Sequence, residues 1–248
     1  MRAFFALWKR ELLAYYFSPI AYVVVLFFLI LMGFSVWFLI GMLSVGSISG
    51  SIMTVLYGES IFFWVAMLIA IPVITMRLLA DELNSGTIES LLTAPVTERS
   101  VVLAKYAGAM TFFVIMWLPT IAYAYIIRHY DPNMSVDLLP MLTGSIGTWL
   151  IGSAFISMGI LASSVTKNQV IAAIICFVMV GLAFFGGFVP YLTAIPLVRS
   201  ISSYFSPILH MMDFSRGILD SRPFILYASA TILLLFTSIR VVESGRWK

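Results

Sequence analysis

The stretch that decides the fold is IAYVVVLFFLILMGFSVWFLIGML, residues 20–43. No charged side chain interrupts this run. An α-helix needs about 20 consecutive apolar residues to cross the hydrocarbon core of a bilayer. The stretch reaches that length, and it is apolar on every face, as a helix surrounded by lipid and other helices must be. We therefore expect a transmembrane helix over residues 20–43.

Five further apolar runs follow, and we expect them to span the bilayer at about 61–79, 107–127, 139–162, 170–189 and 224–239. The composition agrees, since 62% of the 248 residues are hydrophobic and 10% are charged. A soluble domain is roughly half apolar and about a quarter charged. The sequence thus predicts an all-α integral membrane protein, in which residues 1–248 form a single six-helix transmembrane domain.

The distribution of basic residues predicts the orientation of these spans. Six spans place both termini on one side of the membrane, and ten of the 14 Lys and Arg residues fall on that side. Cytoplasmic loops carry the excess of Lys and Arg in membrane proteins. We therefore expect both termini, and the loop over residues 77–106, to be cytoplasmic.

Residues 2–17 are typical of an amphipathic helix at the membrane interface. Its apolar stripe has spacings of three and four residues and consists of Phe5, Trp8, Leu12 and Tyr15. Aromatic side chains on such a stripe are suited to anchoring a helix at the cytoplasmic surface of the lipid. Packing of the same stripe on the protein is an equally good interpretation, and both can hold. Ser18-Pro19 ends this helix before the first span.

The segment before the last span, residues 190–223, is not a simple loop. It carries a helical apolar stripe made of Ile201, Tyr204, Phe205, Ile208, Leu209 and Met212. Pro207 interrupts the stripe, so we expect one or two short helices. They would lie at the outer membrane surface or dip into it, as a re-entrant segment does where protein shields its backbone.

The sequence offers little for catalysis. Its two histidines stand near carboxylates, as His129 with Asp131 and His210 with Asp213, which we interpret as solvated interfacial pairs. An outer-face membrane enzyme using His210 and Asp213 remains a minor alternative. We expect no catalytic residue, no bound metal or cofactor and no nucleic-acid partner. The chain also lacks a Walker A P-loop, so any ATP-driven work needs a second chain that binds the nucleotide.

The most informative polar stretch is PVITMRLLADELNSGTIESLLTAPVTERSVVLAK, residues 72–105. We expect residues 76–83 to continue the second span into the cytoplasm. Residues 84–86, Asn-Ser-Gly, then end that helix. The two ends of this stretch would thus be helical stalks that rise from the membrane.

A short second helix should follow between these stalks. Thr87 can cap it, with Glu89 near the positive end of its dipole, and Pro95 stops it. Its apolar face contains Leu92. Such a helix is suited to docking into a groove on a soluble partner. A hairpin that only connects two spans is the alternative.

These residues resemble the hallmark of the ABC-2 type permeases. MRLLADE followed by SGTIESLLTAPV is similar to M-R-x-x-A-E-E, a few residues, then G-T-x-E-x-L-L-x-x-P, with Asp81 in place of a glutamate. FFALWKRELLAYYFSPIAY, residues 4–22, resembles the interfacial helix of these proteins. Within the family, the chain is most similar to the gliding-motility permease, and less so to the permease of nitrous oxide reductase maturation.

The resemblance implies a permease subunit in a bacterial inner membrane, surrounded by lipid and paired with a second copy or a related permease. Residues 84–96 would form a coupling segment seated on a cytosolic ABC ATPase, which binds ATP and magnesium. The residues that match the motif are Glu82, Gly86, Thr87, Glu89, Leu92 and Pro95. The work would be export or mechanical work in the membrane. The alternative is a membrane scaffold that recruits a partner through the same loop without transport.

Overall fold

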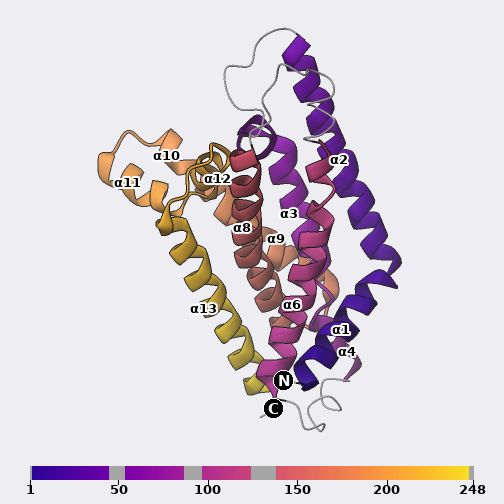
Figure 1. The fold of residues 1–248 in the computed structure, drawn as a ribbon. Helices are drawn as coiled ribbons and strands as arrows, with labels where there is room; N and C mark the ends of the chain where they lie inside the picture. The colour runs from indigo at the N-terminus through magenta and orange to yellow at the C-terminus, as the bar shows by residue number, and fades with distance from the viewer. Residues whose placement is uncertain (1, 45–53, 87–96, 124–137, 246–248) are drawn as a thin grey trace.

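The computed structural model describes residues 2–44, 54–86, 97–123 and 138–245. Within these ranges, six helices are long and apolar enough to cross a membrane. They are Pro19–Met42, Ile61–Ser85, Glu98–Tyr123, Leu139–Val165, Gln169–Leu192 and Ser221–Ser244. The predicted all-α membrane fold with six spans is therefore confirmed. The first helix begins, and the last helix ends, at the same end of the bundle, as an even number of spans requires (Figure 1).

The regular elements in the described ranges are all helices. They are α1 (Arg2–Tyr16), α2 (Pro19–Ser44), η1 (Thr54–Glu59, a π-helix), α3 (Ile61–Thr75), α4 (Ala80–Ser85), α6 (Glu98–Trp117), α8 (Leu138–Val165), α9 (Gln169–Gly186), α10 (Val189–Leu192), α11 (Pro196–Phe205), α12 (Pro207–Ser215) and α13 (Ser221–Gly245). The helix of the third span begins at Glu98 rather than near residue 107. Thr97 caps it there, because its side chain accepts a hydrogen bond from the Ser100 N–H.

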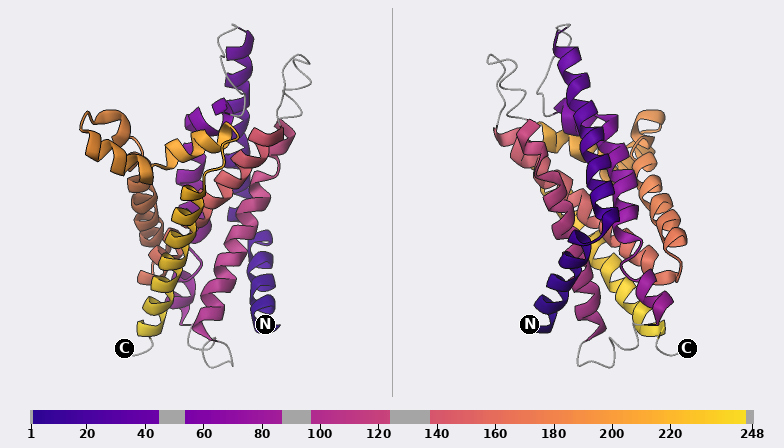
Figure 2. Two further views of the ribbon diagram at one scale, coloured as in Figure 1. Left: turned by 60° about the vertical axis from the view of Figure 1, so that its left-hand side comes forward. Right: turned by 90° about the vertical axis from the view of Figure 1, so that its right-hand side faces the viewer.

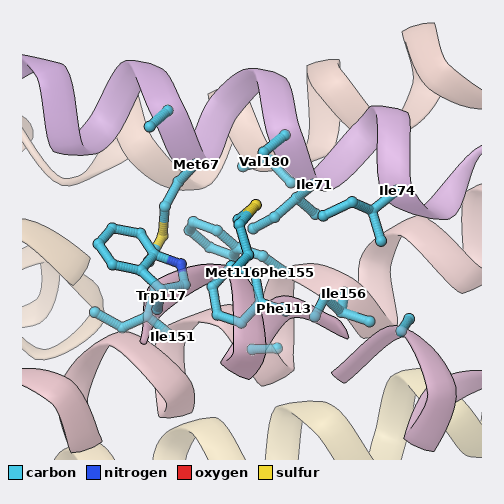
Figure 3. Close-up of a cluster of buried hydrophobic side chains, with 14 of the residues drawn as sticks. Met67, Ile71, Ile74, Phe113, Met116, Trp117, Ile151, Phe155, Ile156 and Val180 are labelled. Carbon is cyan, nitrogen blue, oxygen red and sulfur yellow. The ribbon is translucent and has the colours of Figure 1, made fainter. Parts of the chain in front are cut away.

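The centre of the bundle is formed by α3, α6 and α8. More than half of the apolar window of each is buried, against a third or less for α2, α9 and α13. The core that they share (Figure 3) contains Met67, Ile71, Ile74, Phe113, Met116, Trp117, Ile151, Phe155, Ile156 and Val180. The three less buried helices therefore turn large apolar faces outward, toward lipid or another protein.

Glycines let the central helices approach closely. A Cβ at Gly159 of α8 would overlap the Thr75 side chain of α3, and one at Gly152 would overlap the Phe113 ring of α6. Thr75 also lies 3.7 Å from the Cys176 sulfur of α9. The C-terminal end of α3, at Thr75, is therefore packed closely between α8 and α9, without room for larger residues.

The segment over residues 190–223 divides at Pro207. None of the residues in α11 is buried, and α11 stands off the bundle together with α10 (Figure 2). By contrast, α12 is buried against α8 and η1, with Met211 and Phe214 almost fully covered. The Ser206 hydroxyl ties the start of α12 to the end of α9, because it accepts from the Leu209 N–H and donates to the Gly187 carbonyl. The stripe thus faces the bundle only after Pro207.

Candidate functional site

The second span is broken just before the predicted coupling segment, residues 84–96, whereas the sequence predicted that residues 76–83 continue its helix. Helix α3 ends at Thr75, residues 76–79 form turns, and α4 resumes at Ala80. Helix α4 ends at Gly86, whose φ of 69° is left-handed and suits glycine.

One hydroxyl from α8 satisfies the backbone at this break. The Ser163 Oγ accepts from the Leu79 N–H and the Ala80 N–H, both at 3.0 Å. The same hydroxyl donates to the Met76 carbonyl at 3.2 Å. Backbone groups within a membrane protein must find such partners, because lipid offers none. Ser163 is itself fully buried, so it fixes the angle between α3 and α4 from a neighbouring helix.

A cluster of four charged residues, here called the charge cluster, joins α4 to α1 and α6, and three of the four side chains are largely buried. It consists of Arg10, Glu11, Glu82 and Lys105. The Lys105 ammonium donates to Glu11 Oε1 at 3.1 Å and to Glu82 Oε1 at 2.9 Å. The Arg10 guanidinium donates to the same Glu82 oxygen at 2.9 Å. The cluster is neutral overall, and its centre, Lys105, is only 3% exposed.

The close approach of α1 to α6 makes this cluster possible. A Cβ on Gly108 of α6 would lie 2.9 Å from the Glu11 Cβ, so only glycine fits there without displacing α1. Trp8 donates to the Thr111 hydroxyl at 3.2 Å, on the same face of α6. Tyr15 donates to the Ile74 carbonyl at 2.9 Å. Helix α1 is thereby fixed to both α6 and α3.

The four expected membrane anchors fall into two groups. Trp8, Leu12 and Tyr15 are half-buried, and the Tyr15 ring stacks on Phe112 of α6 at 4.8 Å. Phe5 is 57% exposed. The stripe therefore packs mainly on the protein, which was one of the two interpretations, and the contact of Phe5 with lipid stays a prediction.

Two of the six residues expected to act in coupling can be placed. Glu82 belongs to the charge cluster, and Gly86 forms the end of α4. The other four, Thr87, Glu89, Leu92 and Pro95, lie outside the described residues.

Sequence reasoning missed Glu11, Lys105 and Ser163. Glu11 gave a signal, because it lies three residues after Trp8 and four before Tyr15, on the apolar face of α1. Lys105 was missed because the third span was expected to begin after it. The role of Ser163 depends on a contact across 84 residues of sequence.

His210 is engaged with a neighbouring helix. Its Nδ1 lies 2.9 Å from the Tyr227 hydroxyl of α13, and the imidazole is 7% exposed. Among the described residues, no group of three or more His, Cys, Asp or Glu side chains could hold a metal ion. The pair of His129 with Asp131 falls outside the described residues.

We expect this histidine to make stability depend on pH. Burial lowers the pKa of His210, although Asp220 partly opposes the shift. Below about pH 6.5 the unfolded chain then binds a proton at this histidine more readily than the native state does. The free energy of unfolding therefore decreases as the pH is lowered. Burial raises the pKa of Asp213, which has the opposite effect at lower pH. The melting temperature in detergent should therefore fall more for the wild type than for His210→Gln between pH 7.5 and 5.5. An equal fall in melting temperature for the wild type and His210→Gln would contradict the lowered pKa of His210.

One comparison with known proteins identifies the family. A family model described as ABC-2 type transporter matches residues 2–219, which cover most of the chain and include α1, the charge cluster and α12. A search of curated proteins found no match.

Proposed function

The chain belongs to the ABC-2 type transporter family, and we propose that it is the permease subunit of an ATP-driven exporter whose ATPase is a separate cytosolic chain. Residues 84–96 would dock on that ATPase as the coupling segment. ATP and magnesium would bind there, and not on this chain. The observation that carries the proposal is the position of Glu82, a motif residue that is tied to both α1 and α6 at the base of this segment.

Both ends of the coupling segment lead into the charge cluster. On one side, α4 ends at Gly86 and holds Glu82; on the other, α6 begins after Thr97 and holds Lys105. A push on the segment would therefore reach two helices joined by an ion pair. Helix α1 would follow, because Glu11 and Arg10 bind the same pair. The three helices would move as one body when the ATPase closes.

The proposed permease would be surrounded by lipid and paired with a second permease. The exposed apolar faces of α2, α9 and α13 favour contact with lipid and with a second permease copy or a related permease. The bias of basic residues favours cytoplasmic termini, and the family motifs favour a bacterial inner membrane. The motif resemblance supports a place near the gliding-motility permeases, with export or mechanical work in the membrane as the output.

Co-purification with a candidate ABC ATPase tests the proposal. We expect Glu89→Arg combined with Leu92→Arg to abolish binding, because two cations would replace an acidic and an apolar contact in the docking groove. The matched control is Ser200→Arg, which adds a cation on exposed α11 at the opposite end of the bundle (Figure 1). Binding that survives the double substitution would mean that residues 84–96 are not the docking segment.

A further inference from the structure

A cavity opens beside the charge cluster, at the same end of the bundle. It lies between α1, α2, α3, α4 and α6 and has a volume of about 270 Å³. Its inner wall is apolar and includes Ala21, Val24, Val73 and Phe112. These residues belong to helices that span the membrane. The cavity is therefore charged at its mouth and apolar toward the bilayer interior.

Two buried polar atoms on this wall have no hydrogen-bond partner among the described residues. One is a donor, the Arg77 Nε, and the other is an acceptor, the Glu82 Oε2. The nearest carboxylate to the Arg77 Nε is that of Asp81, whose oxygen is 3.6 Å away, beyond hydrogen-bond distance. The other oxygen of Glu82, Oε1, accepts from both Arg10 and Lys105, which leaves Oε2 unused. Buried polar atoms normally find partners, so both atoms point to a bound group.

The charges around the cavity are balanced. Its wall holds three cations and three anions: Arg10, Arg77, Lys105, Glu11, Asp81 and Glu82. A simple anion or a simple cation would meet three side chains of its own sign. A group that carries both charges meets a partner for each. The free donor, Arg77 Nε, needs an anionic acceptor, and the free acceptor, Glu82 Oε2, needs a cationic donor.

We propose that this cavity binds the headgroup of an ethanolamine phospholipid from the adjacent leaflet. The ammonium donates to the Glu82 Oε2, the phosphate accepts from the Arg77 Nε, and the start of an acyl chain lies along Ala21 and Val24. Choline lipids carry the same charges but have no N–H to donate, and glycerol lipids have no cation. The volume is near the lower limit for small-molecule sites, which suits a headgroup rather than a whole lipid. This binding does not depend on the partner ATPase.

Native mass spectrometry of the full chain tests the proposal. The protein is released from vesicles that hold equal amounts of phosphatidylethanolamine, phosphatidylcholine and phosphatidylglycerol, and the retained lipid is counted. Because one charge-assisted hydrogen bond distinguishes the headgroups, we expect the ethanolamine lipid to be retained about tenfold over the choline lipid. Equal retention of the three lipids, or a preference for phosphatidylglycerol, would overturn the proposal.

Two variants assign the selectivity to this cavity. Arg77→Lys keeps the positive charge but removes the Nε, and Ala21→Trp fills the apolar wall. Each should reduce the preference to near parity, whereas Arg99→Lys, at the same end of the bundle but outside the cavity, should keep it. If Ala21→Trp fails to fold, Arg77→Lys alone tests whether the lipid binds in this cavity. A preference that persists in Arg77→Lys would place the bound lipid elsewhere.

Discussion

Replacing Lys105 by methionine is expected to lower the free energy of unfolding by about 3–5 kcal/mol, the usual cost of removing one partner from a buried ion pair. The substitution leaves Glu11 and Glu82 facing each other without the ammonium that binds both. The Arg10 guanidinium cannot replace it, because its side chain is 54% exposed and lies 3.5 Å from Glu11. Unfolding by sodium dodecyl sulfate in mixed micelles, followed by circular dichroism, measures the loss.

The matched control for this prediction removes all three charges together. Lys105→Met with Glu11→Gln and Glu82→Gln leaves only Arg10 charged, and its side chain is 54% exposed, so no buried unpaired ion remains and much of the stability should return. If Lys105→Met alone is as stable as the wild type, the cluster does not hold α1 and α4 on α6.

Replacing Ser163 by alanine is expected to have the second large effect. It removes one hydroxyl but leaves three backbone groups without that partner: the buried N–H groups of Leu79 and Ala80 and the half-buried carbonyl of Met76. A buried polar group left unsatisfied costs about 1–3 kcal/mol, so the two N–H groups alone predict a loss of about 2–6 kcal/mol. The same unfolding experiment measures it.

Ser164 provides the control, since it is the next residue and is also buried. Its hydroxyl donates to the Leu161 carbonyl of its own helix, so Ser164→Ala frees no backbone group of another element. We expect it to change stability by less than about 1 kcal/mol. Equal effects of Ser163→Ala and Ser164→Ala would show that the break in the second span is not stabilised by α8.

Much of the fold could be predicted because membrane spans are encoded locally. The length of an apolar run and the absence of charge within it are properties of a continuous stretch, as in residues 20–43. The break after Thr75 could not be located in this way. Pro72 indicates a kink, but the partner that completes the broken backbone is Ser163, on a helix far along the chain.

The charge cluster of the candidate site also could not be predicted from local sequence. Glu82 was found because it belongs to a family motif, whereas Lys105 was assigned to a loop and Glu11 was not singled out. Their pairing depends on the close approach at Gly108, which no local pattern indicates. Apolar periodicity also cannot distinguish lipid from protein, because both are apolar; α11 and α12 share one stripe, yet only α12 is buried.

The most direct test of ATP-driven coupling through α4 is a pair of distances measured by spin labels on the permease in complex with its ATPase. Cysteines at the exposed positions Lys9, Asn84 and Ser244 would carry the labels, since the natural Cys176 is fully buried. After ATP hydrolysis is arrested with vanadate, which traps the ADP formed, we expect the distance between positions 84 and 244 to change, while that between positions 9 and 84 stays constant. An 84–244 distance that is the same with and without trapped nucleotide would contradict the proposed coupling.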